Sequence, residues 1–295
     1  MNNGFIIVNK ERGFTSFDVC AKLRGILKTR KIGHTGTLDP DATGVLLVCV
    51  GNATKVVDIL PSEDKEYRAV VHFGITTDTE DISGQVLTTC NDTVPEDAVR
   101  EAILSFIGDI KQIPPMYSAI KVDGKKLYEL AREGKVIERK ARDITIHDIM
   151  IESIEYPYAT ILVKCSKGTY IRTLCKDIGE KLNVGACMES LVRTSAGGFN
   201  ISGALTLSEI EERVKTGLID EIIIPTERLF EEYEISYVKE DRIKLAENGN
   251  RLIADDFKSI PDTLRTRVHI GNRFIGIYEF DDEKGDYKPY KMFLE

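Results

Sequence analysis

The chain has 295 residues, which suits one large domain with a smaller one, and 42% of them are hydrophobic, as in ordinary globular proteins. Its formal net charge of −8 argues against a uniformly basic nucleic-acid-binding surface. No apolar run reaches the roughly 18 residues of a membrane-spanning helix, and the apolar start of the chain is too short for a signal peptide.

The first two thirds of the chain mix strands and helices. Thr15 or Ser16 is positioned to cap a helix that runs from Asp18 to about Leu27. Residues 112–121 are predicted to be extended, because two adjacent prolines forbid a helix there. Strands are predicted at 5–8, 45–50, 65–73, 144–154 and 159–165, and helices at 95–107, 127–134, 170–182 and 207–216. Without a regular βαβ period, this order favours an α+β fold with an antiparallel or mixed sheet.

The pattern changes at about Ile235. Short strand-like runs at 251–254, 267–270, 274–280 and 290–294 are separated by turn sequences rich in Asn and Gly. They predict a small β-barrel domain of about 60 residues. We therefore expect a first domain over residues 1–234 and a second over residues 235–295.

Charge and cysteine usage add two expectations. Residues 205–295 hold 14 basic and 21 acidic residues, so nearly all of the excess acid lies in the last third. Two basic clusters, at 10–31 and 121–142, flank the segment around Asp39, and together they favour a groove for a polyanion over two solvated faces. The six cysteines form no C-x-x-C pair, and no histidine lies at metal-ligand spacing to them, which predicts free thiols in a reducing, cytoplasmic compartment.

The most informative segment is Gly33 to Leu46, which carries Asp39 in a loop rich in Gly and Thr, followed by an apolar strand. A loop carboxylate can act as a nucleophile, a general base or a metal ligand, or it can simply shape a turn with Pro40 and Asp41. Because Pro40 separates the two aspartates, their side chains are expected to diverge.

Residues 39–43 also fit D-x-D-x-T, which resembles the Mg²⁺-dependent phosphatase motif of the haloacid dehalogenase family. That motif should follow an apolar strand in a parallel βαβ fold. Here it follows a polar loop, and the βαβ pattern is missing, so this reading is not favoured.

A longer match favours another family. Gly33 to Leu46 resembles the catalytic motif of the TruB family of tRNA pseudouridine synthases. Four more segments resemble the motifs of that family in the same order: 10–16, 64–81, 112–134 and 165–174. The resemblance covers essentially the whole chain, with departures at Glu11, where the family usually has proline, and at Val192, where it often has arginine.

The resemblance implies that the protein isomerises uridine 55 in the T-arm of tRNA to pseudouridine, by base flipping and without a cofactor or metal. Asp39 is then the essential carboxylate, which attacks C1′ or abstracts a sugar proton. Arg172 is expected to pair with Asp39 and keep it ionised. Tyr67 is expected to stack on the everted uracil, and its hydroxyl to assist proton removal at C5.

Three further residues receive substrate-binding roles from the resemblance. His34 is expected to fill the space that the everted base leaves in the RNA, Leu191 to form an apolar wall for the uracil, and Lys10 to shape the pocket. Residues 113–142 resemble the RNA-gripping insertion of the family, and residues 235–295 resemble a PUA RNA-binding module. We expect tRNA as the partner, a monomer with no obligatory protein partner, and no membrane association. A role as a tRNA-folding chaperone is compatible with the same contacts.

Overall fold

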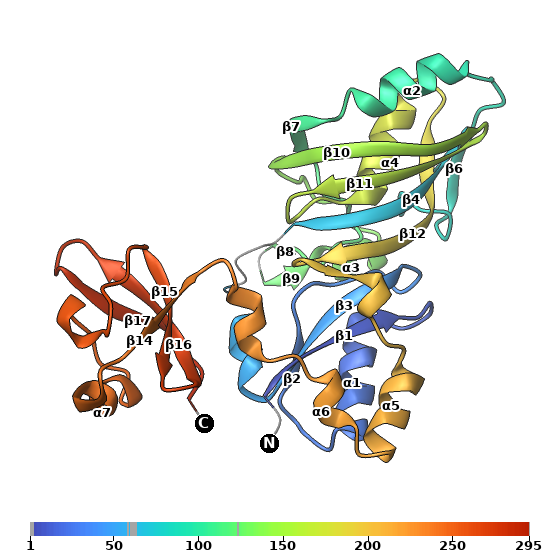
Figure 1. Cartoon of the computed structure of the whole chain (residues 1–295). Helices are drawn as coiled ribbons and strands as arrows, with labels where there is room; N and C mark the ends of the chain where they lie inside the picture. The colour runs from blue at the N-terminus through green and yellow to red at the C-terminus, as the bar shows by residue number, and fades with distance from the viewer. Residues whose placement is uncertain (1–2, 58, 60–63, 123, 295) are drawn as a thin grey trace.

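The computed structural model describes residues 3–57, 59, 64–122 and 124–294. Its main sheet is built from Gly4–Lys10 (β1), Ile32–His34 (β2), Thr43–Val50 (β3), Lys65–Phe73 (β4), Gly108–Gln112 (β7), Arg142–Glu155 (β10), Tyr158–Cys165 (β11), Ala186–Ala196 (β12) and Phe199–Asn200 (β13). These strands form a nine-stranded sheet in the order β1-β3-β12-β4-β11-β10-β7, with β2 beside β3 and β13 beside β12 (Figure 1). Among the described strands of this sheet, neighbours are antiparallel except β3 and β12, so the predicted α+β fold with a mixed sheet is confirmed.

Two helices cover one face of the β4-β11-β10 half of the sheet, namely Glu96–Leu104 (α2) and Ile171–Lys181 (α4) (Figure 1). They bury one large apolar cluster with alternate residues of β4 and β11, such as Ala69, Val71 and Ile161. The same cluster includes Leu38 of the motif loop. The core under the two helices therefore extends to the segment that carries Asp39.

Strands β1 and β3 are buried on both faces. One set of alternate residues, including Ile6 and Val48, packs against the helices Ser16–Ile26 (α1), Leu207–Lys215 (α5) and Ile219–Ile222 (α6). The other set, including Phe5 and Leu47, packs against Phe230 and Ile277, which belong to the C-terminal part of the chain. This explains why both strands are continuous apolar runs instead of an alternating pattern.

Helix α1 begins at Ser16, two residues before the predicted Asp18, and Thr15 is the cap, one of the two residues that the sequence offers. The Thr15 hydroxyl accepts from Asp18 N at 3.1 Å, and the Asp18 carboxylate accepts from Thr15 N at 2.9 Å. This reciprocal capping box satisfies two backbone donors that the first turn leaves free. The start of α1 is thus fixed by local chemistry.

Two short hairpins lie outside the main sheet. One pairs Ile75–Thr77 (β5) with Val86–Thr89 (β6), and the other pairs Lys121–Val122 (β8) with Lys125–Lys126 (β9). The second hairpin leads into the short helix Leu127–Arg132 (α3), inside the predicted insertion.

The C-terminal part forms its own sheet from Glu234–Tyr237 (β14), Arg265–Ile270 (β15), Arg273–Asp281 (β16) and Asp286–Met292 (β17), in that order. It also carries the short helix Ile243–Glu247 (α7). The predicted small β domain is present, although no pairing among the described residues joins β14 to β17 and closes a barrel. The division into domains at residues 234 and 235 stays a prediction.

Two strand predictions in this part need correction. Residues 251–254 make only a single bridge, between Leu252 and Tyr287, because Asp256 accepts from Ile253 N at 2.9 Å and turns the chain into a 3-10 segment. The last strand begins at Asp286 instead of residue 290, because the turn ends at Gly285 and pairing with β16 resumes at once.

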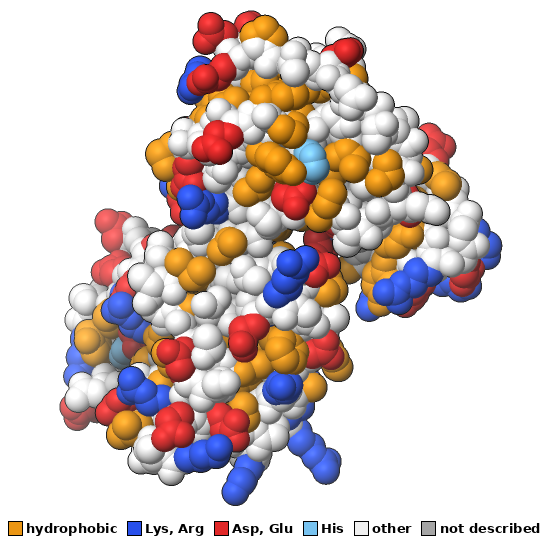
Figure 2. Space-filling view, turned by 90° about the vertical axis from the view of Figure 1, so that its right-hand side faces the viewer, with side chains coloured by type: hydrophobic (Ala, Val, Ile, Leu, Met, Phe, Trp, Pro, Cys, Tyr) orange, Lys and Arg blue, Asp and Glu red, His pale blue; other side chains and the backbone are white. Residues whose placement is uncertain are grey.

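The surface differs between the two ends of the molecule. On the face shown in Figure 2, hydrophobic side chains gather over the upper part, whereas acidic and basic side chains are interspersed over the lower part. Among the helices of the described residues, none combines the length and apolar character needed to cross a bilayer.

Candidate active site

The loop between β2 and β3 carries Asp39, and both neighbours of Asp39 are anchored. Leu38 N donates to the Ser16 hydroxyl at 2.8 Å, and this hydroxyl donates to Leu38 O at 3.3 Å. On the other side, Pro40 O accepts from Gly13 N at 2.9 Å. Because its neighbours are fixed to the start of α1, Asp39 has a defined position although it lies on a loop.

The buried side chain of Lys10 is hydrogen-bonded to the backbone of this loop. It is fully buried, and its ammonium group donates to the carbonyl oxygens of Glu11 at 3.1 Å, Phe14 at 2.7 Å and Pro40 at 3.0 Å. Burial lowers the pKa of Lys10 from 10.5 to about 8, against the opposing effect of the Asp39 charge. Lys10 therefore acts on Asp39 through the backbone of the loop and through its charge.

The two carboxylates of the motif diverge, as predicted. Asp41 pairs with the exposed Arg12 at 3.0 Å. Asp39 faces the opposite partner, Arg172, whose Nε lies 2.9 Å from Asp39 Oδ2 and whose Nη2 lies 3.3 Å from Asp39 Oδ1. This is the two-pronged arrangement in which a guanidinium fixes the plane of a carboxylate.

Arg172 is itself held by the surrounding backbone. It is 4% exposed, and it donates to Thr79 O at 2.9 Å and to Tyr117 O at 2.8 Å, while Asp81 lies 3.9 Å from its Nη1. The Asp39 side chain, in contrast, is 38% exposed. A fixed buried cation beside an accessible carboxylate leaves the carboxylate able to meet a substrate.

The position of Arg172 follows from the way α4 begins. Gln112, the last residue of β7, is buried and forms two reciprocal hydrogen bonds with the backbone of Tyr170, at 2.8 Å and 3.0 Å. One turn into the helix, the Thr173 hydroxyl donates to Glu80 at 2.6 Å. Strand β7 and the turn after β5 thus fix the end of α4 that presents Arg172.

Arg193 on β12 is a second buried arginine at the site, and sequence reasoning missed it. It is 2% exposed and donates to Val45 O at 2.7 Å and to Gly36 O at 3.2 Å. Its positive charge also acts on the Tyr67 hydroxyl of the neighbouring strand β4. Arg193 therefore links the two ends of the motif loop by hydrogen bonds and interacts with Tyr67 electrostatically.

Gly44 makes this arrangement possible. It has φ +101°, and a Cβ atom placed on it would lie 2.2 Å from Arg193 O. Gly44 pairs with Arg193 where β3 and β12 run parallel. Only glycine allows the two backbones to approach this closely.

The remaining predicted residues lie around this framework. Tyr67 and Leu191 are nearly buried in one apolar cluster with Leu38 and Ala42. Burial raises the pKa of the Tyr67 hydroxyl, and the Arg193 charge lowers it. His34 lies on β2 and interacts electrostatically with Arg193; burial, then the charge of Arg193, lowers its pKa.

The structure thus brings five of the six predicted residues into one connected group: Asp39, Arg172, Lys10, Tyr67 and Leu191. His34 joins it less directly, and its Nδ1 is buried without a hydrogen-bond partner among the described residues. Sequence reasoning named Ser16 only as a possible helix cap and missed its bonds to Leu38, and it gave Gln112 and Arg193 no role. The first two have no sequence signal beyond their place in quoted motifs, and Arg193 could have been noticed as an arginine inside a strand.

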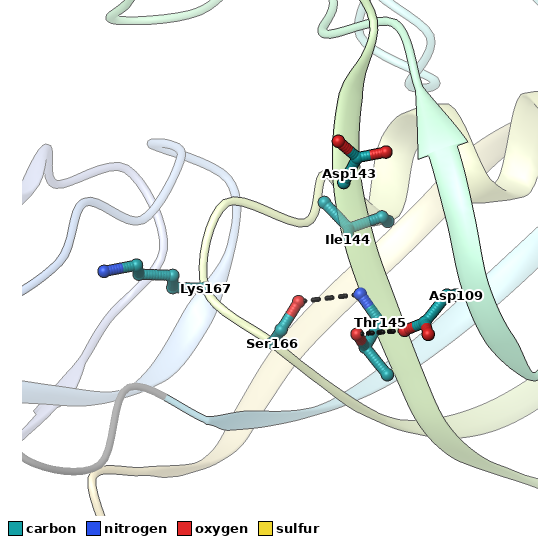
Figure 3. Close-up of a pocket in the computed structure, with 6 residues that line it drawn as sticks. All are labelled: Asp109, Asp143, Ile144, Thr145, Ser166 and Lys167. Atoms are coloured by element: carbon teal, nitrogen blue, oxygen red, sulfur yellow. Dashed lines mark hydrogen bonds between the residues drawn. The ribbon is translucent and has the colours of Figure 1, made fainter.

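A hollow elsewhere on the molecule is separate from this group. It is lined by Asp109, Asp143, Ile144, Thr145, Ser166 and Lys167, from β7, β10 and the loop after β11 (Figure 3). Thr145 donates to Asp109 at 2.6 Å and to Ser166 at 2.9 Å, so much of the polar lining is already paired. The described residues also contain no group of three His, Cys, Asp or Glu side chains arranged to hold a metal ion.

Comparison with known proteins finds relatives over nearly the whole chain. Residues 24–171 match the family described as TruB family pseudouridylate synthase (N terminal domain), and residues 172–231 match the tRNA pseudouridylate synthase B C-terminal domain. The chain is 53% identical to tRNA pseudouridine synthase B of Lachnoclostridium phytofermentans, over 99% of this chain and 100% of the relative. It is 46% identical to the protein of the same name from Clostridium kluyveri, over 99% and 100%.

Among solved structures, a chain from a crystal structure of a Cbf5-Nop10-Gar1 complex is similar, with a TM-score of 0.77 and 26% identity. The match covers 99% of this chain and 85% of that one. The family matches cover residues 24–231, and the relatives are similar over their full length. Together they assign the chain to one family. The chain belongs to the TruB family of pseudouridylate synthases.

Proposed function

We propose that this pseudouridine synthase acts on tRNA, at the uridine in position 55 of the T-arm, with Asp39 as the essential carboxylate. The names of the full-length relatives support tRNA as the substrate. The observation that carries the assignment of Asp39 is its two-pronged contact with the buried Arg172, at 2.9 Å and 3.3 Å.

The isomerisation is balanced within one nucleotide. The N1–C1′ bond breaks, the uracil turns, and a C5–C1′ bond forms, while C5 loses a proton and N1 gains one. Asp39 starts this sequence either by attacking C1′ or by removing a proton from the sugar. Both routes need an ionised and accessible carboxylate, and its 38% exposure next to a fixed guanidinium supports either.

The other residues have supporting roles in this proposal. Tyr67 stacks on the uracil, and its hydroxyl assists the loss of the C5 proton. Leu191 forms the apolar wall beside it, and both side chains already share one apolar cluster. Lys10 holds the loop through Pro40 O.

The target base must first leave the RNA stack, which costs a few kcal/mol. In our proposal His34 occupies the vacated space, and the lowered pKa of its partly buried ring favours the neutral form, which can stack there. The insertion at 113–142 grips the RNA, and its contact with the site through Tyr117 O and Arg172 supports a link between RNA binding and the catalytic centre. The PUA-like domain at 235–295 adds a contact to the RNA.

The test compares Asp39→Asn with a matched control, Asp41→Asn, on an unmodified tRNA transcript without added metal. Asp41 lies two residues away and forms its ion pair with the exposed Arg12, so its variant should keep nearly full activity. Asp39→Asn should form no pseudouridine at position 55, as mapped by chemical probing, and should remain folded, as checked by circular dichroism. Pseudouridine formation by Asp39→Asn, or modification at another position only, would overturn the corresponding part of the proposal.

The same contacts allow a chaperone role, in which the protein opens and refolds the tRNA elbow. This role depends on binding and not on the carboxylate. Asp39→Asn should therefore still accelerate folding of a misfolded tRNA transcript. Loss of both folding and modification in that variant would contradict the chaperone role.

A further inference from the structure

We infer that Phe17 and Arg24 on α1 form an accessory stacking site for one nucleobase of the RNA substrate, next to the uridine pocket but outside it. This inference rests on the proposed function, because it assumes an RNA substrate. Neither residue belongs to the group around Asp39, and the mechanism above does not use them.

The Phe17 ring is exposed to solvent beside an anchored guanidinium group. It is 64% exposed, although it lies in the first turn of a capped helix whose backbone is fixed. The guanidinium of Arg24 lies 5.3 Å from the centre of the ring. Arg24 is fixed in turn, because it donates to Ile32 O at 3.1 Å. Single exposed apolar residues are common, but an exposed ring beside an anchored guanidinium provides two flat surfaces that stack on a base.

The position of this pair relative to the active site favours a substrate contact. Ser16, directly before Phe17, is hydrogen-bonded to Leu38, directly before Asp39. Arg24 is bonded to Ile32, the first residue of the strand that ends at His34. Phe17 and Arg24 therefore flank the whole segment from β2 to the catalytic loop. We therefore expect an RNA that inserts a uridine at Asp39 to reach this flank.

The surrounding charge selects RNA over an apolar partner. Exposed Lys22, Lys28, Arg30 and Lys31 lie on α1 or directly after it. The acidic neighbour Asp18 is engaged in the capping box with Thr15. A second cation–ring pair, Lys22 Nζ at 4.6 Å from the Phe14 ring, repeats the combination beside the first. Aromatic rings interleaved with cations suit the bases and phosphates of unpaired RNA.

The experiment measures binding of an unmodified tRNA transcript in the Asp39→Asn background, where no turnover occurs. Phe17→Ala should weaken binding by roughly five- to 100-fold, the range for loss of one base–aromatic stack. Phe17→Trp should restore it, whereas Phe17→Leu, which keeps an apolar side chain without a ring, should behave like Phe17→Ala. In the catalytically active protein, Phe17→Ala should raise KM and leave kcat unchanged.

Met150→Ala is the matched control. Met150 is 51% exposed, and it aligns across β11 and β4 with Arg68, on the face of the sheet opposite to that of Tyr67. This variant should bind as the unchanged protein does. Arg24→Ala removes the guanidinium beside the Phe17 ring and should also weaken binding of the transcript.

The outcomes separate the two proposals. Binding by Phe17→Ala within twofold of the unchanged protein, or full binding by Phe17→Leu, overturns the stacking site while pseudouridine formation by the wild type stands. A wild-type protein that leaves the transcript unmodified overturns the proposed function instead, and one that does not bind it overturns both.

Discussion

Lys10→Met is expected to destabilise the protein by removing hydrogen bonds that hold the loop that carries Asp39. Lys10 donates three hydrogen bonds to backbone carbonyls from a fully buried position. Hydrogen bonds from a charged donor contribute about 1.5–3 kcal/mol each. Against this, the fall in the pKa of Lys10 from 10.5 to about 8 corresponds to an unfavourable difference of about 3 kcal/mol. Because Pro40 O keeps its bond from Gly13 N, we expect a net loss of about 2–4 kcal/mol at pH 7.

The difference in stability between wild type and Lys10→Met is expected to depend on pH. Between pH 8 and 10.5 the folded protein holds fewer protons on Lys10 than the unfolded chain does, so wild-type stability rises with pH in this window. Below pH 8 Lys10 is protonated in both the folded and the unfolded state, so it causes no change of stability with pH there. The methionine variant has no titrating group at this position, so it lacks this rise in stability at every pH. The difference in stability between wild type and variant should therefore widen, by up to about 3 kcal/mol, as the pH rises from 7 to 10.5.

Urea unfolding followed by circular dichroism, at several pH values with both proteins side by side, measures this difference. All other titrating groups are shared, so they cancel in the comparison. Equal unfolding midpoints at pH 7, or a difference that narrows as the pH rises, would refute the reasoning about Lys10.

Three more predictions follow from buried groups of the fold. Arg193→Met should lower kcat by at least about tenfold and raise the pKa of Tyr67, measurable by ultraviolet titration of tyrosinate, because the guanidinium that lowers this pKa is lost; an unchanged pKa would show that the two side chains are not coupled. Gly44→Ala should lower the free energy of unfolding by more than about 3 kcal/mol. Gly198→Ala has a similar positive φ but open space around it, so it should lower the free energy of unfolding by about 1 kcal/mol. Similar thermal shifts for both variants would show that backbone strain, and not the contact with Arg193, causes the loss. Burial raises the pKa of Asp177 to about 6, so its charge opposes folding above that pH. Asp177→Asn should thus stabilise the protein by about 1–2 kcal/mol at pH 7 and by almost nothing at pH 4 in urea unfolding, and a gain that grows as the pH falls would contradict this.

The sequence by itself determined the features that depend on neighbours along the chain. The capping box of Thr15 and Asp18 fixes the start of α1, and paired prolines keep the start of the insertion extended, because both effects act within a few residues. The divergence of Asp39 and Asp41 follows from Pro40 in the same way. Asp39 was identifiable because its whole motif is contiguous. The strand predicted at 251–254 is absent because a local carboxylate competes for the backbone.

Only the tertiary structure decided how the residues around Asp39 are held in place. Arg172 reaches it because Gln112, far away in the chain, binds the backbone at the start of α4. Arg193 supports the loop because β12 runs parallel to β3 at Gly44, a register that no local pattern encodes. Buried arginines are satisfied by carbonyl groups from several segments at once, so their partners exist only after the chain has folded.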